Sequence, residues 1–255
     1  MTTTDQKLAE LVKRLKEAAG DNLESVILYG SAGRGEIRGK HDDLNVLCTM
    51  RSTAVADLAP LAPTVKWWCN RQEERAPVFF TAEELRQSAD VFAIEILDMQ
   101  KGHRVVYGSD PVAAIPVPMN LHRVQVEHDL RTLVLKLRHH FLHACGEDRE
   151  LRGVIAKSFS SVLTLLRHLL IDFGEEPPAA PLDVFARIAA RTGADAGAFA
   201  AALEIRDNGE HREELSRVYG RYLEALEKAT AALDRILPKR EWRRHPDNSG
   251  THSHT

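Results

Sequence analysis

A glycine-rich segment joins two apolar runs in the stretch SVILYGSAGRGEIRGKHDDLNVLCTM, residues 25–50. The first run, residues 25–29, is rich in β-branched and aromatic side chains and stops at Gly30 and Ser31. The second run extends over residues 44–50. Runs of this composition bounded by glycine are typical of strands. The sequence therefore predicts two short strands with a glycine-rich connection.

The chemistry of this segment follows from the groups at its two ends. Glycine lets the backbone approach a phosphate closely, and the Ser31 hydroxyl and exposed backbone N–H groups can donate hydrogen bonds to it. Side chains two residues apart on a strand point to one face, which places Asp43 and Asn45 together. Two acids at such positions hold the divalent metals that assist nucleotidyl transfer. We therefore predict a phosphate-binding turn beside a metal site in which one ligand is an amide.

The part of the chain before residue 110 mixes predicted helices and strands. Apolar residues at helical spacing predict a first helix that ends at Gly20. Thr81 and Glu84 have the spacing of a capping box, which predicts the start of another helix. Further short strands are predicted at residues 78–80 and 104–107. This mixture indicates a sheet with helices packed against it.

After residue 110 the pattern changes. Pro111, Pro116 and Pro118 prevent a continuous helix and predict a stiff connector. Helical periodicity then predicts segments at residues 121–144, 147–173, 182–192 and 210–237, with a short piece near Phe199. The predicted fold class is therefore α+β, with a mixed-sheet domain at residues 1–110, a helical bundle at residues 119–238 and a disordered tail at residues 239–255.

The run LYGSAGRGEIRGKHDDLNV resembles the signature of the nucleotidyltransferase superfamily, whose fold is shared by DNA polymerase beta and kanamycin nucleotidyltransferase. The family pattern is Gly-Ser, a variable stretch rich in Gly and Arg, and then Ser-Asp-x-Asp-Leu. The resemblance covers the predicted mixed-sheet domain, and the helical remainder resembles the bundle that such proteins often append. It implies that Gly30, Ser31 and Arg34 bind a nucleoside triphosphate, and that Asp43 and Asn45 hold Mg²⁺. The implied reaction transfers a nucleotidyl group to a hydroxyl of a small molecule or a protein.

Two positions depart from the family pattern. Asp42 occupies the place of the usual Ser, and Asn45 occupies the place of the second Asp. An amide oxygen can coordinate a metal but brings no charge, whereas Mg²⁺ is held chiefly by anionic oxygen. Loss of this charge weakens metal binding and transition-state stabilisation. Two hypotheses follow: a working enzyme, or a catalytically degenerate member that binds a nucleotide or a protein partner without turnover.

A third acid is expected on a later strand of the same sheet. Glu95 lies in the apolar run VFAIEILDM, and in an extended chain it would face away from Ile94 and Ile96. We therefore predict Glu95 as the third catalytic and metal-binding residue, with Asp98 as the second candidate. The alternative is that Glu95 is a surface acid or lies on a helix face.

Other groups of residues allow competing interpretations. Arg138 and His143 have the Arg-x4-His spacing of HEPN ribonucleases, although such spacings also arise on solvated helix faces. Trp67 and Trp68 could stack on a nucleobase, but buried packing is the more frequent use of tryptophan.

Composition limits the classes of partner. The formal net charge of −3 gives no global basic patch for nucleic acid, and the three cysteines form no CxxC pair. No apolar stretch of about 20 residues and no signal peptide is recognised in the sequence, so we expect a cytoplasmic protein that does not enter a membrane. The acceptor and the preferred nucleotide are left open, and so is a homodimer.

Overall fold

The computed structural model describes residues 3–30, 32–33, 44–144, 146–209 and 213–235. The chain divides into two compact units, Met1–Asp129 and Leu130–Thr255. Helix α6 (Met119–Ala144) contributes its first turns to the N-terminal unit and the rest to the helical unit. The fold class is α+β, as predicted. The domain limits at residues 110, 119 and 238 stay predictions.

The N-terminal unit is built on a four-stranded sheet with the order β3-β2-β1-β4. Its strands are β1 (Leu23–Tyr29), β2 (Asn45–Met50), β3 (Val78–Thr81) and β4 (His103–Gly108). β1 is antiparallel to both of its neighbours, and β2 is parallel to β3. The strands predicted at residues 25–29, 44–50, 78–80 and 104–107 are confirmed, and the glycine-rich segment connects the two central strands, β1 and β2.

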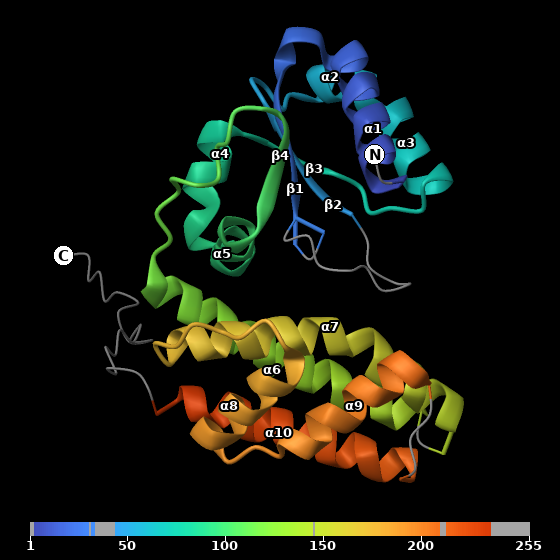
Figure 1. Ribbon diagram of the computed structural model, residues 1–255, viewed down its shortest axis with the longest axis vertical. Helices are drawn as coiled ribbons and strands as arrows, with labels where there is room; N and C mark the ends of the chain where they lie inside the picture. Colours follow the sequence, from blue (N-terminus) through green and yellow to red (C-terminus); the bar gives the residue numbers. More distant parts are fainter. Residues whose placement is uncertain (1–2, 31, 34–43, 145, 210–212, 236–255) are drawn as a thin grey trace, which may run out of the picture. The chain divides into compact units, whose positions relative to one another are not determined.

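Helices cover both faces of this sheet (Figure 1). One face carries α1 (Thr3–Ala19), α2 (Val55–Leu58) and α3 (Ala62–Arg71), and the other carries α4 (Ala82–Gln87) and α5 (Ala93–Lys101). Short 3-10 helices lie at Gly20–Asn22, Ala59–Leu61 and Ser88–Asp90. The predicted capping box is present, because Glu84 N–H donates to Thr81 Oγ1 and Thr81 N–H donates to the Glu84 carboxylate.

The alternation of side chains along β1 gives the sheet two separate cores. Val26 and Leu28 point to the face that carries α1 and α3, and they pack in one cluster with Leu11 and Trp68. Ile27 points to the opposite face and packs with residues of α4 and α5. Both faces of the strand are therefore apolar and fully buried, which holds its C-terminal end in a fixed position.

The helical unit contains the remainder of α6 together with α7 (Asp148–Asp172), α8 (Pro181–Thr192), α9 (Ala196–Asn208) and α10 (Leu215–Leu233). Helix α7 contacts α8, α9 and α10. The predicted apolar stripe on α7 is confirmed, since all of its members are buried: Leu151, Ile155, Phe159, Val162, Leu166 and Leu169. The piece predicted near Phe199 is a full helix, α9.

Helix α7 is also long and apolar enough to cross a membrane by length and composition alone. Charged residues such as Lys157 and Arg167 interrupt α7, so it does not contradict the expectation that the sequence has no run of about 20 apolar residues. Half of its most apolar window is buried inside the protein, as the central helix of a bundle requires.

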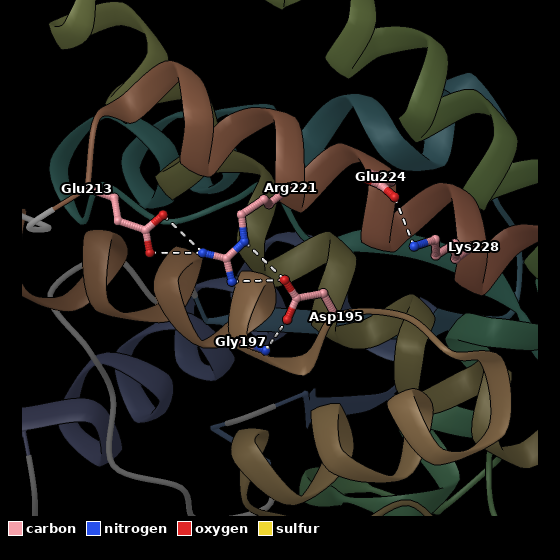
Figure 2. Close-up of polar contacts among 6 residues, drawn as sticks. All are labelled: Asp195, Gly197, Glu213, Arg221, Glu224 and Lys228. Atoms are coloured by element: carbon pink, nitrogen blue, oxygen red, sulfur yellow. Dashed lines mark hydrogen bonds and ion pairs between the residues drawn. The ribbon is translucent and has the colours of Figure 1, made fainter.

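The start of α9 is held by an ion-pair network (Figure 2). Asp195 is the N-cap of α9, and its Oδ1 accepts a hydrogen bond of 2.8 Å from Gly197 N–H. Arg221 of α10 donates to Asp195 Oδ2 at 2.8 and 3.0 Å and to both Glu213 oxygens at 2.9 and 3.0 Å. One guanidinium thus joins the cap of α9 to the segment that precedes α10.

Candidate nucleotide site at the end of strand β1

The backbone turns sharply where β1 ends. Gly30 has φ +76°, a left-handed conformation that side chains rarely adopt. Gly33 packs so closely on the end of the sheet that a Cβ there would lie 2.6 Å from Gly102 O and 2.9 Å from Leu28 O. Side-chain-free backbone at both positions keeps the turn tight against the strand. Both positions therefore favour glycine over residues with a side chain.

Asn45 lies directly beside this turn. It is the first residue of β2 and pairs with Tyr29, the last residue of β1. Its Nδ2 atom lies 3.0 Å from the position that a Cβ on Gly30 would occupy. The structure therefore brings Gly30 and Asn45 together, and their membership of one site stays a prediction.

Glu95 lies on helix α5, so the prediction that places it on a strand is wrong. The alternative of a helix-face position is the one that the structure bears out, and Asp98 lies on the same helix. The Glu95 side chain is exposed, and its Oε2 accepts a hydrogen bond of 3.0 Å from Gln125 Nε2. Gln125 Oε1 also accepts from Ile94 N–H at 3.0 Å, so one amide fixes the first turn of α5.

The Glu95 charge nevertheless acts on Tyr29, the last residue of β1. Burial first, and then the Glu95 charge, raise the pKa of Tyr29, while Arg75 acts in the opposite direction. A helix, rather than a strand, thus brings an acid toward the residue that precedes the turn. Strands β3 and β4 contain no acidic residue, because their sequences are VFFT and HRVVYG.

The described residues do not form a complete site for Mg²⁺. Within that part of the chain, no group of three or more His, Cys, Asp or Glu side chains is arranged to hold a metal ion. Asn45 offers one neutral oxygen, and a neutral ligand alone does not fit a hard dication. Ser31, Arg34 and Asp43 of the predicted site, and Asp42 next to it, lie outside the described residues.

Sequence reasoning missed a buried acid, Glu74, at the start of β2. Glu74 Oε2 accepts a hydrogen bond of 2.7 Å from Leu44 N–H, and Glu74 Oε1 lies 3.0 Å from Lys7 Nζ. Only 5% of the Glu74 side chain is exposed. The sequence gives no signal for this role, because Glu74 stands in the charged run NRQEER, which resembles a solvated segment.

A histidine lies on the other side of β1. His103 of β4 pairs with Tyr29, and its ring nitrogens lie 2.7 Å from Met99 O and 2.8 Å from Asp110 Oδ2. The ring thus joins the end of α5 to the segment that follows β4. Partial burial acts to raise the pKa of Asp110, but hydrogen bonds from the His103 side chain and from two backbone N–H groups lower it overall.

The competing features of the sequence have ordinary structural partners. Trp68 is fully buried, and its Nε1–H donates to Arg75 O at 2.9 Å. Trp67 lies under the Arg14 guanidinium, 4.3 Å from its ring centroid. Arg138 pairs with Glu227 at 2.8 Å. Buried packing is thus confirmed for Trp68, whereas the ribonuclease interpretation of the helical unit gains no support from Arg138.

The described chain thus consists of a four-stranded mixed sheet with helices on both faces, followed by helices alone. Among solved structures, spectinomycin adenyltransferase AAD(9) from Enterococcus faecialis, determined with ATP and spectinomycin, has a similar fold. The TM-score is 0.55 and the sequence identity 14%, and the match covers 87% of this chain and 98% of that chain. At this identity the likeness establishes the fold alone. No protein-family profile and no curated protein matches the sequence.

Proposed function

We propose that this protein binds a nucleoside triphosphate at the turn after β1 and transfers its nucleotidyl group to a hydroxyl of a small molecule or a protein. One observation carries the proposal: the left-handed Gly30, with the Asn45 side chain directly against it, at the end of a strand buried on both faces. The fold supports it, since the similar AAD(9) is an adenyltransferase that was solved with ATP.

Different residues of the chain would bind the phosphates and assist the attack of the hydroxyl. Gly30 and Gly33 hold the backbone close enough for phosphate contacts, to which Ser31 and Arg34 would add side-chain donors. The exposed carboxylate of Glu95, held by Gln125, is suited either to coordinate a cation or to accept the proton of the attacking hydroxyl. Mg²⁺ dependence through Asp43, Asn45 and Glu95 stays a prediction, and no step is derived from the metal.

A second function, nucleotide or partner binding without transfer, is favoured by Asn45 itself. An amide in place of the second acid removes a negative charge from the position where charge stabilises a metal. The turn around Gly30 does not depend on that charge. Binding can therefore persist where transfer is lost.

Titration calorimetry with ATP, with and without Mg²⁺, tests the proposal. We expect the parent protein to bind ATP, and Ser31→Ala to weaken binding by roughly five- to tenfold through loss of a phosphate donor. Asn45→Asp should increase the effect of Mg²⁺ on affinity, since a second anion returns to the strand. No binding of millimolar ATP by the parent protein would refute both nucleotidyl transfer and nucleotide binding.

Pyrophosphate release then separates transfer from binding. With a panel of hydroxyl-bearing acceptors, a working enzyme releases pyrophosphate in the parent form. Release that appears only in Asn45→Asp identifies the natural protein as a binder whose missing charge prevented turnover. A cytoplasmic location and a homodimer belong to the proposal as well, and fractionation and light scattering test them.

A further inference from the structure

Glu74 lies in the segment that connects α3 to β3, and several hydrogen bonds hold the backbone of this segment in place. Lys7 Nζ donates to Gln72 O at 3.2 Å, and Glu74 N–H donates to Trp68 O at 3.4 Å. Trp68 Nε1–H donates to Arg75 O at 2.9 Å. Helix α1 and the buried indole of α3 therefore fix the backbone on both sides of Glu74.

This segment also contains an unfavourable backbone conformation. Glu73 has φ +56°, and within the described residues no other residue besides glycine has a positive φ. A left-handed conformation is unfavourable at such a residue and persists only where surrounding contacts require it. The next side chain, Glu74, points inward to Leu44, which precedes β2.

We infer that Glu74 is a positioning residue for the nucleotide site, because it fixes the start of β2 and thereby holds Asn45 against the phosphate-binding turn. The inference rests on the proposed function. Its carboxylate holds Leu44 N–H at 2.7 Å, and Leu44 is fully buried. Asn45 follows directly, with its amide against Gly30.

The contact with Leu44 is stronger than a neutral hydrogen bond. A carboxylate that accepts from a backbone N–H makes a charge-assisted bond, which is shorter and stronger than one between neutral groups. Lys7 compensates the buried charge from α1. An anchor of this kind restricts the first peptide of β2, and preorganisation of a binding group raises affinity by lowering the cost of ordering it.

The test compares Glu74→Gln with Glu73→Gln, two identical chemical changes at neighbouring residues, one buried and one exposed. Glu74→Gln replaces the carboxylate with a side-chain amide of the same size. It removes the negative charge that contacts both Leu44 N–H and Lys7. We expect ATP affinity, measured by calorimetry, to fall about five- to tenfold in Glu74→Gln. Glu73→Gln should bind ATP like the parent protein.

Two further measurements separate positioning from general loss of stability. Leu85 of α4 lies in the core on the opposite face of the sheet, and Leu85→Val shortens its side chain by one methylene, so this variant serves as a destabilised control with an intact site. It should bind ATP like the parent. Hydrogen exchange of the Leu44 amide should accelerate in Glu74→Gln by more than it does in Leu85→Val.

The outcomes distinguish the positioning role of Glu74 from the proposed function of the protein. If the parent binds ATP and Glu74→Gln binds it equally well, the positioning role is overturned and the proposed function stands. The role is also overturned if Leu85→Val weakens ATP binding as much as Glu74→Gln does. If the parent binds no ATP, the proposed function fails and the role fails with it.

Discussion

Two carboxylates in this protein each accept a hydrogen bond from a backbone N–H and pair with a basic side chain, but they differ in burial. Glu74 holds Leu44 N–H at the start of β2 and pairs with Lys7, and Asp195 holds Gly197 N–H at the start of α9 and pairs with Arg221. The Glu74 side chain is 5% exposed, whereas the Asp195 side chain is 46% exposed.

The two pairs differ in burial rather than in the kind of contact, and burial determines how much such a pair contributes to the free energy of unfolding. A buried charge that loses its partner cannot be solvated, so the loss of one partner is costly. An exposed charge that loses its partner is solvated by water instead. Most exposed pairs therefore contribute less than about 1 kcal/mol to stability. The same substitution should therefore have unequal effects in the two units.

The largest effect is expected from Lys7→Met. This change leaves the Glu74 carboxylate buried without its cation, although Leu44 N–H still donates to it. The free energy of unfolding should fall by about 2 kcal/mol, less than for a fully buried pair because the Lys7 side chain is 29% exposed. Urea denaturation measures the change. The double variant with Glu74→Gln should recover part of the loss, and a loss within error of zero would contradict the assigned importance of burial.

A smaller effect is expected from Arg221→Gln. The Arg221 side chain is 33% exposed and its partners Asp195 and Glu213 are 46% and 36% exposed, so water replaces much of what is lost. The free energy of unfolding should fall by about 0.5–1 kcal/mol, and high salt should reduce the difference from the parent. A loss as large as that of Lys7→Met would remove the contrast between the two regions.

The smallest effect is expected from titration of Asp195. Hydrogen bonds from Arg221, and then the charge of Arg221 and two backbone N–H groups, lower the pKa of Asp195 from its ordinary 3.8, and burial acts in the opposite direction. Because the folded-state pKa is the lower one, its contribution to stability is present above 3.8 and disappears as the pH falls through the folded-state pKa.

Melting temperatures measured from about pH 5 to about pH 2.5 report this change. Arg221→Gln should make the decline in melting temperature over this interval shallower, since it removes the main cause of the shift. An identical decline in the parent and in Arg221→Gln would assign the acid sensitivity to other carboxylates.

Most of the fold could be predicted because it follows from local patterns. Strands β1 and β2 read as continuous β-rich runs since both of their faces are buried, and the capping box at Thr81 fixed the start of α4. The length of α9 was underestimated because AGAFAAALEI is apolar all round and has little helical periodicity, although alanine favours helix.

Glu95 shows why the site was harder to predict than the fold. In VFAIEILDM, apolar residues on both sides of the acid are compatible with a strand and with a helix, and short apolar runs do not distinguish the two. In the structure Ala93, Ile94, Ile96 and Met99 are buried on one side of a helix. Glu74 was beyond prediction for a different reason, since its role depends on contacts with Lys7 and Leu44, 67 and 30 positions away.

Gly33 has a consequence for how this protein tolerates sequence change. Three backbone atoms would lie within 2.9 Å of any Cβ at this position, and backbone, unlike a flexible side chain, cannot move aside cheaply. A saturation library selected for function should therefore reject every substitution of Gly33. Position 33 would thus score like a catalytic residue although glycine has no side chain to take part in the chemistry, and its intolerance would reflect geometry alone.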